Sequence, residues 1–586
     1  MKKIILISAL LFTALFAKAQ YFQHLYGTTD NEAYVKGVNT FIQPQGHLMA
    51  ASGDKLVVTY TDVNGSVSSS PNFNKDYQII SNITGTTMPT SSVNVFELED
   101  GSGFGVVGLC FDPSVSSAVR SIFYLHIDPT GVPGTVYEYI PVPGSVALYN
   151  LISVNAVAKS PGTDDLYIAG ATESSSNDNF IYALKINSVN GNIVWSAFYD
   201  VVQTGINQKE YIGGIIESPY QPAGVQELVL VGGGYDMAGN SQDAFFMRVD
   251  ANNGAPLGPW AFFYGTAATE DVFTSISIAN SNIGGTNGFV VGGYSNHNGS
   301  YDFWMLKLDT RGGVIWSRLY DYSVSPGNND ICYGVIERFN TSNNYEYYAV
   351  GHTSSPTVFN TYDILVIKTD DWGNGVAGGE FTYGIASVNE FGWGIDQYDG
   401  TGADGLSVFG ISELGGIGMS DVYLIKAYFN GLSGCNESFS TPKTKRGPGL
   451  YAETWVDAFD NFSPSSLSSS EQSASDVNLC YNTTIGGGSN ARTAPSDPGT
   501  SATVVPNPMT QGAATATVEL EAETPATVQV TIYDMLGKQY YAGNFALVKG
   551  SNRLPVDISS ASMAAGMYTV KITGDNINKN VLLVVK

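Results

Sequence analysis

The sequence is poor in the residues that mark common metal and catalytic sites. Its 586 residues include only four cysteines and five histidines. The cysteines form no C-x-x-C pair and the histidines no H-E-x-x-H pair, which argues against a structural zinc site and a zinc protease. A G-x-S-x-G elbow and a G-x-x-x-x-G-K-S/T phosphate loop are also missing. A catalytic triad stays open, because geometry and not sequence order defines one.

Positive charge is scarce as well. Lys and Arg together number 27 against 53 Asp and Glu, which gives a formal net charge of -26. Such a chain repels phosphate backbones and anionic lipids, so we expect no nucleic-acid partner. The acidity suits an exported protein or a cation-dependent one.

Long apolar runs are missing beyond the N-terminus. "MKKIILISALLFTALFAKAQ" has Lys2 and Lys3, an apolar run and a small-x-small end, the layout of a secretory signal peptide over residues 1–19. A membrane anchor is the alternative, but the run is short for a span. We therefore predict a mature chain that leaves the cytoplasm and has no transmembrane segment.

The cysteines fall into two groups. Cys435 and Cys480 flank a polar segment, and in an oxidising compartment we expect a disulfide between them. Cys110 and Cys332 lie in strand-like runs and are predicted to be buried thiols.

The chain contains an internal repeat of about 60 residues. Apolar runs ending in glycine recur at intervals of 59–62 residues, at Gly108, Gly170, Gly232, Gly292, Gly351 and Gly410, and "HLMAA" supplies a seventh copy. A second strand follows each run, as in "DFWMLKLD", then a turn and a strand that closes in an aromatic residue, as in "VIWSRLYD". An acid opens the next unit. Each unit thus offers four short strands.

Seven units of four strands predict an all-β protein with a seven-bladed β-propeller at residues 20–435. Blades pack face to face, which explains why "DFWMLKLD" is apolar on both faces. The N-terminal strand "YFQHLYG" is expected to complete the seventh blade and so hide open edges. An open solenoid or paired β-sandwiches are the alternatives. Residues 436–503 are rich in Ser, Gly and Pro and are predicted to be a linker, although "GLYAETWVDAF" within it is apolar enough to pack on the propeller.

Ordered alternation returns at residues 504–586, which predicts a small C-terminal β-sandwich. Several motifs follow one another in this segment, and their residues are Pro506, Asn507, Pro508, Asp534, Gly537, Gly566, Tyr568 and Lys586. In these residues the segment resembles the type A C-terminal sorting domain of cargo for the type IX secretion system of Bacteroidota. The resemblance covers only the last 80 or so residues, and an accessory sandwich that binds carbohydrate or merely stabilises is the alternative.

The resemblance implies passage across the outer membrane and contact with the type IX machinery. It also implies removal of the domain by a sorting peptidase, followed by release or attachment at the cell surface.

The acid that opens each repeat is the one recurring polar feature: Glu210, Asp271, Asp330 and Glu390, with Glu32 as an approximate fifth. If these acids encircle a channel mouth, they are candidate binding residues that could attract Ca²⁺, although no cofactor is required. The favoured alternative is structural, because scaffold parts repeat and functional sites seldom do: each carboxylate accepts backbone N–H bonds and holds blade to blade. Strand pairs such as Asp302 and Lys307 are expected to cap turns and pair strands.

Four aromatic residues are candidates for stacking on sugars: Tyr235, Tyr294, Trp372 and Trp393. The alternative is that they belong to the blade core. We therefore predict an exported, non-enzymatic propeller that binds a glycan or a protein. The competing hypothesis is an extracellular polysaccharide hydrolase or lyase that uses axial carboxylates as acid and base.

Overall fold

A computed structural model gives the structure of the protein. It describes residues 21–585 except 28–31, 43–44, 69, 82–83, 114–119, 142–149, 161–162, 164, 174–178, 202–209, 221–224, 236–241, 259–260, 267–268, 282–286, 297–298, 323–328, 355–360, 386–387, 399–403, 415–419, 434–436, 441–442, 447–448, 455–456, 460–461, 474, 482–501, 506–508, 510–514, 523–524, 535–538, 559–562, 564–565 and 575–576. The predicted signal peptide lies outside this range. The chain divides into two compact units, Met1–Gly487 and Gly488–Lys586.

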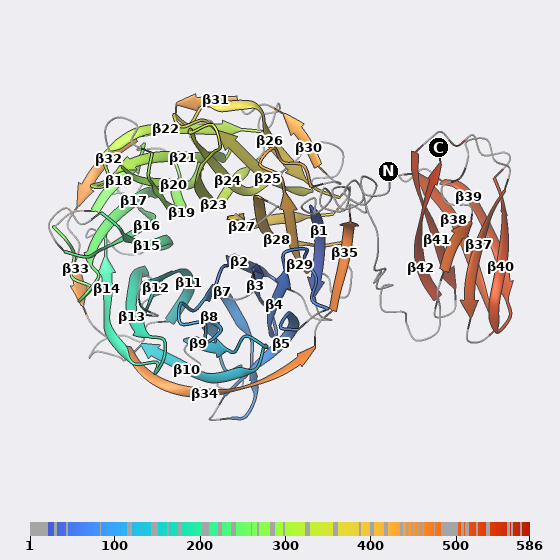
Figure 1. The fold of residues 1–586 in the computed structure, drawn as a ribbon, viewed down its shortest axis with the longest axis horizontal. Coiled ribbons are helices and arrows are strands. Elements are labelled where there is room, and N and C mark those ends of the chain that lie inside the picture. The colour runs from blue at the N-terminus through green and yellow to red at the C-terminus, as the bar shows by residue number, and fades with distance from the viewer. Residues whose placement is uncertain are drawn as a thin grey trace, which may run out of the picture. The chain divides into compact units, whose positions relative to one another are not determined.

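The first unit contains seven four-stranded antiparallel sheets that stand around a common axis like propeller blades, here called the ring (Figure 1). Inner strands of neighbouring blades contact one another all the way round, from β2 through β27 and back to β2. From the inner to the outer strand, the first blade contains β2 (Tyr34–Thr40), β3 (Gly46–Ser52), β4 (Leu56–Asp62) and β5 (Phe73–Ile80), with short β6 (Thr87–Met88) beside β5; the second contains β7 (Thr90–Glu97), β8 (Phe104–Cys110), β9 (Ser121–Ile127) and β10 (Pro133–Pro141); and the third contains β11 (Asn150–Lys159), β12 (Asp165–Glu173), β13 (Asn179–Asn187) and β14 (Ile193–Asp200). The fourth blade contains β15 (Tyr211–Ser218), β16 (Glu227–Tyr235), β17 (Gln242–Asp250) and β18 (Ala261–Gly265), and the fifth contains β19 (Asp271–Ala279), β20 (Gly288–Ser295), β21 (Asp302–Asp309) and β22 (Val314–Asp321). The sixth blade contains β23 (Asp330–Phe339), β24 (Tyr345–Ser354), β25 (Tyr362–Thr369) and β26 (Gly375–Tyr383), and the seventh contains β27 (Glu390–Tyr398), β28 (Gly405–Ser412), β29 (Asp421–Ala427) and β1 (Phe22–Gly27).

The prediction that the N-terminal strand completes the seventh blade is confirmed. Strand β1 pairs antiparallel with β29, with Phe22 opposite Lys426 and Tyr26 opposite Val422. The fourth strand of this blade therefore comes from the opposite end of the repeat region, and it ties the two ends of the ring together.

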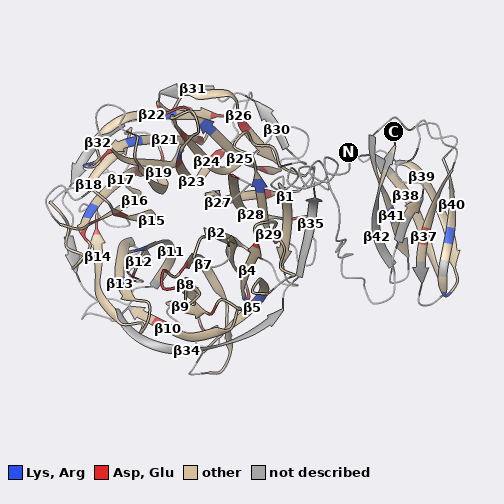
Figure 2. Cartoon of the chain, in the orientation of Figure 1, with Lys and Arg blue, Asp and Glu red and all other residues tan. Residues whose placement is uncertain are grey.

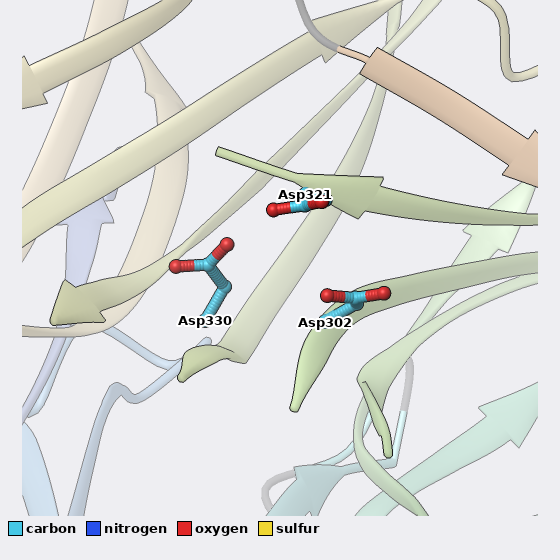
Figure 3. Close-up of side chains that lie close together, drawn as sticks. All are labelled: Asp302, Asp321 and Asp330. Atoms are coloured by element: carbon cyan, nitrogen blue, oxygen red, sulfur yellow. The ribbon is translucent and has the colours of Figure 1, made fainter. Parts of the chain in front are cut away.

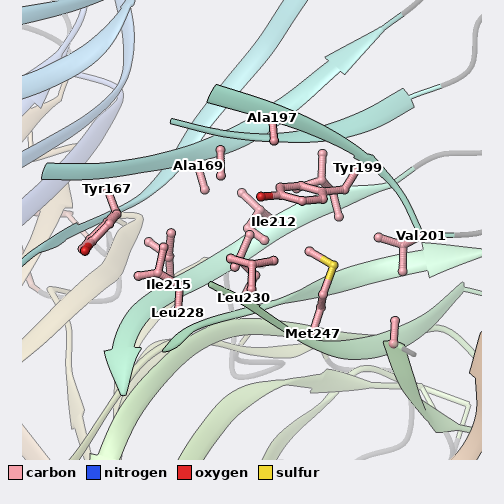
Figure 4. Packing of buried hydrophobic residues seen from close by; sticks show 14 of the residues in the cluster. Tyr167, Ala169, Ala197, Tyr199, Val201, Ile212, Ile215, Leu228, Leu230 and Met247 are labelled. Carbon is pink, nitrogen blue, oxygen red and sulfur yellow. The ribbon is translucent and has the colours of Figure 1, made fainter. Parts of the chain in front are cut away.

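Burial on both faces of the inner strands is also confirmed. On β21, Trp304 and Leu306 pack with residues of the fourth blade, whereas Phe303 and Met305 pack with Cys332 and residues of the sixth. All four side chains are fully buried. The same face-to-face packing joins the third and fourth blades, where Tyr199, Leu230 and Met247 share one cluster (Figure 4). Each blade is thus held by its neighbours, and burial of apolar area supplies the cohesion.

Residues 437–481 differ from the predicted linker. They form six strands that pair with the outer strands of the blades in reverse order around the ring, and we call this segment the belt (Figure 1). Its strands are β30 (Glu437–Ser440) on β26, β31 (Lys443–Arg446) on β22, β32 (Gly449–Thr454) on β18, β33 (Asp457–Phe459) on β14, β34 (Phe462–Ser473) on β10 and β5, and β35 (Ser475–Tyr481) on β1.

The physical reason is that an outer strand presents unpaired N–H and C=O groups, which any extended backbone can satisfy. A Ser-rich segment such as β34 needs no apolar side chains for this pairing. The expectation that "GLYAETWVDAF" packs on the ring is confirmed by β32 and β33. The domain boundaries near 435 and 504 stay predictions.

The second unit holds two antiparallel sheets around one core. The first sheet contains β36 (Ala502–Val505), β37 (Thr515–Ala522) and β40 (Gly550–Asp557), and the second β39 (Gln539–Leu547), β38 (Ala526–Asp534), β41 (Gly566–Gly574) and β42 (Ile577–Val585). Val528, Val530 and Ile532 alternate inward as predicted and share a buried cluster with Val518 and Leu554 of the other sheet. The described residues include no helix with the length and apolar character needed to span a bilayer.

Candidate functional site

The recurring acids lie where the chain passes from one blade to the next. Each one begins an inner strand or, as with Glu210, lies just before it. Each is almost fully buried and accepts a hydrogen bond from the backbone N–H of a residue just after the outer strand of the preceding blade. The N···O distances are 2.8 Å from Val201 to Glu210, 3.2 Å from Thr266 to Asp271, 2.8 Å from Tyr322 to Asp330 and 3.4 Å from Ile385 to Glu390. This repeated bond holds successive blades together. Ligand binding by these acids stays a prediction.

At several of these junctions a second acid is present. It comes from the beginning of the third strand of the preceding blade. A Cβ on Gly265 would lie 2.2 Å from Asp243 Oδ1 and 2.7 Å from Asp271 Oδ2, so the glycine allows these two carboxylates to approach. Gly384 lies in the same way against Asp363. The junction between two blades is therefore crowded with acid.

Burial shifts the protonation of the acids at two junctions. It raises the pKa of Asp330 to about 7 and that of Glu390 to about 8. The pKa of Asp363 rises to about 6 for the same reason. A carboxyl group in such a place carries a proton for part of the time near neutral pH, which lessens repulsion between neighbouring acids.

The junction between the fifth and sixth blades carries a third acid. Asp302, Asp321 and Asp330 each place one carboxylate oxygen within 4.8 Å of the others (Figure 3). At the matching position of two other blades the residue is Gly265 or Gly384, which has no side chain to offer. Other acidic positions occur on all sides of the ring, and basic ones are fewer and scattered (Figure 2).

Aromatic residues of three inner strands meet near the axis. Trp393 lies 4.9 Å from Tyr34 and 4.4 Å from Tyr333 between ring centroids. The Lys36 Nζ donates to the Trp393 carbonyl oxygen at 2.9 Å, and burial lowers the pKa of Lys36 to about 8. Aromatic rings and an amine therefore meet at this part of the inner strands.

The aromatic candidates from the sequence fall in different places. Trp393 and Tyr294 are half-buried, and the Tyr294 hydroxyl lies 3.3 Å from that of Tyr211. Trp372 is 49% exposed on the turn before β26, and the side chain of Tyr235 lies outside the described residues. Of the three whose side chains the structure describes, Trp372 is the one that presents a broad exposed ring.

A cavity of about 220 Å³ opens between the second and third blades. Tyr137 offers a half-buried ring, and polar groups come from Asp100, Ser102, His126, Thr135 and Ser188, with Leu98 and Val189 completing the lining. These residues come from turns and strand ends of two blades, so no local sequence motif predicts that they line a cavity. Sequence reasoning missed this cavity, and His126 was seen only as one of five scattered histidines.

The acid, histidine and serine of the cavity do not contact one another in the order that a catalytic triad requires. Ser102 Oγ lies 3.4 Å from His126 Nε2, a long contact. Asp100 accepts the backbone N–H of Ser102 at 2.8 Å, and the serine hydroxyl and N–H hold the pKa of Asp100 below its usual value. The acid thus lies on the serine side, whereas in a triad it orients the histidine.

The cysteines that the structure describes are confirmed as buried thiols. Cys110 and Cys332 are free and fully buried, and burial raises the pKa of each thiol to about 12. Cys435 lies outside the described residues, and of Cys480 only the backbone in β35 is described. The predicted disulfide therefore stays a prediction.

Part of the predicted sorting motif is ordered in one sheet of the second unit. Asp534 ends β38 and lies opposite Tyr568 of β41, which is 3% exposed in the core. Gly566 begins β41. Pro506, Asn507, Pro508, Gly537 and Lys586 lie outside the described residues.

Comparison with known proteins gives one family match. Residues 503–586 match the family described as the secretion system C-terminal sorting domain. No curated protein gives a significant match.

Among solved structures, the Dos1 propeller is 12% identical, with 70% of this chain and 95% of that chain covered and a TM-score of 0.35. Dimeric latent PorU from Porphyromonas gingivalis is 10% identical, with 87% and 34% covered and a TM-score of 0.13. A tetra-tandem repeat from the extending region of a large adhesion protein is 13% identical, with 73% and 97% covered and a TM-score of 0.11.

The resemblance predicted from the C-terminal motifs is thereby confirmed. Residues 503–586 are a C-terminal sorting domain of the type IX secretion system, which directs the chain to the outside of the cell in Bacteroidota.

Proposed function

We propose that the ring is a seven-bladed β-propeller, that residues 504–586 form a small β-sandwich, and that the exported ring binds a glycan without catalysis. The observation that carries the proposal is the cavity between the second and third blades. It combines one aromatic ring with several neutral and charged hydrogen-bonding groups, the set that a sugar needs for stacking and for its hydroxyls.

The size of the cavity limits which ligands it can hold. At about 220 Å³ it lies below the roughly 300–1,000 Å³ typical of sites that enclose a whole small molecule. It suits one terminal sugar unit of a longer chain that continues into solvent. A protein ligand that inserts one side chain is the second possibility, and the binding experiment separates the two.

The geometry of the acids supports binding over hydrolysis. A hydrolase or lyase needs two carboxylates facing an open site with different protonation states. The recurring acids instead accept main-chain N–H bonds at the junctions, and the raised pKa values of Asp330 and Glu390 follow from burial. They behave as parts of the scaffold.

The sorting domain supplies the other proposed partners. Its family match implies contact with the secretion machinery. We propose in addition that a sorting peptidase removes it, as the resemblance implies, and that the ring is then released or attached at the surface. Intact mass measurement of the secreted chain tests this, because removal subtracts the whole domain.

The test of the binding proposal uses the full secreted chain on a glycan array, with released reducing ends measured in parallel. We expect binding without product, and at least a tenfold loss of affinity in Tyr137→Ala, since a stacking ring is worth about 1.4 kcal/mol or more. Phe339→Ala is the matched control, because Phe339 is 54% exposed on another blade. Reducing ends above a catalyst-free blank contradict the proposal in favour of an enzyme, and binding only to proteins favours the second possibility.

A further inference from the structure

The junction between the fifth and sixth blades brings together carboxylates from three strands. Asp302 begins β21, Asp321 ends β22 and Asp330 begins β23, so both blades contribute. The side chains turn toward one another, and one oxygen of each lies within 4.8 Å of the other two (Figure 3). Asp302 and Asp330 are 1% exposed, whereas Asp321 is half-buried. Acids gather at other junctions as well, so the cluster alone does not define a binding site.

A second observation concerns buried oxygen atoms. Asp330 accepts the Tyr322 N–H with Oδ2 at 2.8 Å, and its Oδ1 is buried without a hydrogen-bond partner among the residues that the structure describes. Thr353 lies directly opposite Asp330 in the pairing of β23 with β24 and is fully buried. Its hydroxyl has no partner in the described part of the chain either. Such atoms are destabilising, and native structures contain few of them.

The Thr353 hydroxyl faces the carboxyl group of Asp330. Burial raises the pKa of Asp330, and the neighbouring Thr353 hydroxyl is one of the groups that lower it again. The two side chains are therefore close, although no hydrogen bond of normal geometry joins them. A cation that contacts both oxygen atoms supplies the partner that each one lacks.

The oxygen chemistry and the spacing favour Ca²⁺. Carboxylate oxygens suit hard cations such as Ca²⁺ and Mg²⁺. Ca²⁺ holds its oxygen ligands at about 2.3–2.6 Å, so two ligands can lie up to about 4.6–5.2 Å apart, a span that includes the 4.8 Å limit of this cluster. Mg²⁺ gives up its water molecules reluctantly, so a largely buried set of side chains suits it less.

We propose that one Ca²⁺ ion binds at this junction and joins the fifth blade to the sixth. Its ligands are Asp302, Asp321, Asp330 and Thr353. Water completes the coordination shell beside Asp321, where the cluster is open to solvent. The candidate Ca²⁺ ligands taken from the sequence combined Asp330 with acids of other junctions around an axis. This site combines it with acids of its own junction and with a hydroxyl group, and needs no ring of acids.

The junction before β27 provides a comparison within the same chain. Ser412 lies opposite Glu390 as Thr353 lies opposite Asp330, and it donates its hydroxyl to Glu390 at 3.0 Å. Gly384 stands there in place of Asp321. The hydroxyl is thus used within the protein and the third carboxylate is absent, so we expect no Ca²⁺ site at that junction.

The direct test is calorimetric titration of the full secreted chain with CaCl₂ after its metal has been removed with EGTA. We expect one site per chain, and we expect Asp321→Gly and Asp321→Asn to weaken it by at least about tenfold. Thr353→Val, which removes the hydroxyl and keeps the shape, is expected to give a smaller loss. Asp363→Asn, at the junction before β27, is the matched control and should change neither affinity nor stoichiometry. No saturable binding up to about 10 mM Ca²⁺, or binding that both Asp321 variants leave unchanged, overturns the proposal.

A second measurement separates loss of the site from loss of the fold. An ion that binds the folded state raises the midpoint of urea unfolding, which tryptophan fluorescence follows. We expect Ca²⁺ to raise this midpoint for the wild type and Asp363→Asn, and to leave it unchanged for Asp321→Gly, which in EGTA should still unfold cooperatively. An equal rise in the wild type and Asp321→Gly would place the ion on other acids and contradict the site. Mg²⁺ should give a smaller rise, and an equal one would contradict the choice of ion.

Discussion

The two sides of the ring are built from different kinds of contact. On the turn side, where the third strand of each blade ends in a turn, a tyrosine of the preceding outer strand donates its hydroxyl to a glycine carbonyl of that turn. The contact occurs at all seven junctions with O···O distances of 2.5–3.0 Å: Tyr26–Gly65, Tyr77–Gly131, Tyr139–Gly191, Tyr199–Gly254, Tyr264–Gly312, Tyr320–Gly373 and Tyr383–Gly431.

On the opposite side, where the chain passes between blades, the contacts vary. The junction before β19 has Asp243 with Asp271, and the next has three acids, Asp302, Asp321 and Asp330. The junction before β27 has Asp363 with Glu390, and burial raises the pKa of both. The turn-side contact joins the same two neutral groups at every junction, whereas the junction-side contacts involve acids and differ from blade to blade. The difference teaches that closure of the ring depends on the turn side, which leaves the junction side free to vary.

The largest effect is expected where a turn glycine is replaced. Gly254 has φ of +75°, and a Cβ there would lie 2.7 Å from the Trp195 ring. Gly254→Ala therefore adds backbone strain and a clash within a buried contact, and we expect it to lower the free energy of unfolding of the ring by about 2–4 kcal/mol. Urea unfolding followed by tryptophan fluorescence measures it.

The control separates strain from the clash. Gly299 has φ of +92° but nothing within 4 Å of a Cβ, so Gly299→Ala is expected to cost only about 1 kcal/mol. Equal costs at the two glycines would show that the turn contact contributes nothing beyond backbone conformation, and the contrast between the two sides would then be unsupported.

A smaller effect, of opposite sign and dependent on pH, is expected on the junction side. Burial raises the pKa of Glu390 from 4.5 to about 8 in the folded state. The folded state thus binds the proton more tightly, and the stability that this provides is fully present below pH 4.5 and is lost as the pH rises to 8. Glu390→Gln removes this loss and is expected to be more stable than the wild type by roughly 1–3 kcal/mol at pH 8.

The measurement is the free energy of unfolding of both proteins at pH 5 and pH 8. At pH 5 the two should be nearly equal, because the amide oxygen of the glutamine can accept the N–H of Ile385 while its NH2 donates to the Ser412 hydroxyl, which lies 3.0 Å from Oε1 of Glu390. The exposed Glu413 provides the control variant Glu413→Gln; its charge adds only slightly to the raised pKa of Glu390, so a much smaller change with pH is expected than for Glu390→Gln. A difference that is the same at both pH values contradicts the protonation argument.

The features of the fold that the sequence predicts are those that produce a local periodic pattern of side chains. Regular spacing predicts the blades, apolar residues on both faces of "DFWMLKLD" predict burial between blades, and "YFQHLYG" predicts closure by β1. Each of these depends on a side-chain pattern within a short stretch. The closing aromatics of the outer strands were visible too, but their hydroxyl bonds to the turn glycines were not.

The belt and the cavity lack such a pattern. Strand β34 pairs through its backbone, so its Ser-rich composition indicates a linker, and the pairing depends on edges that exist only after the ring has formed. The cavity joins His126 of one blade to Ser188 of the next, which no spacing rule connects. For the recurring acids the residue type was visible, whereas the main-chain donors came from structure alone.

The smallest expected effect tests whether the Tyr–Gly hydrogen bonds of the turn side contribute equally to stability, as their similar geometry suggests. Tyr139→Phe removes the donor to the Gly191 carbonyl and leaves the packing of the ring almost unchanged, so we expect a loss of about 1 kcal/mol in the free energy of unfolding. Tyr137→Phe, two residues earlier on the same strand and half-buried, is the control and should cost less than about 0.5 kcal/mol. The same change at Tyr264 should give the same loss as at Tyr139, because both bonds join buried groups at matching positions. Losses that differ by more than a factor of about three would mean that the turn side also varies from blade to blade, and closure of the ring would then depend on a few junctions and not on all seven.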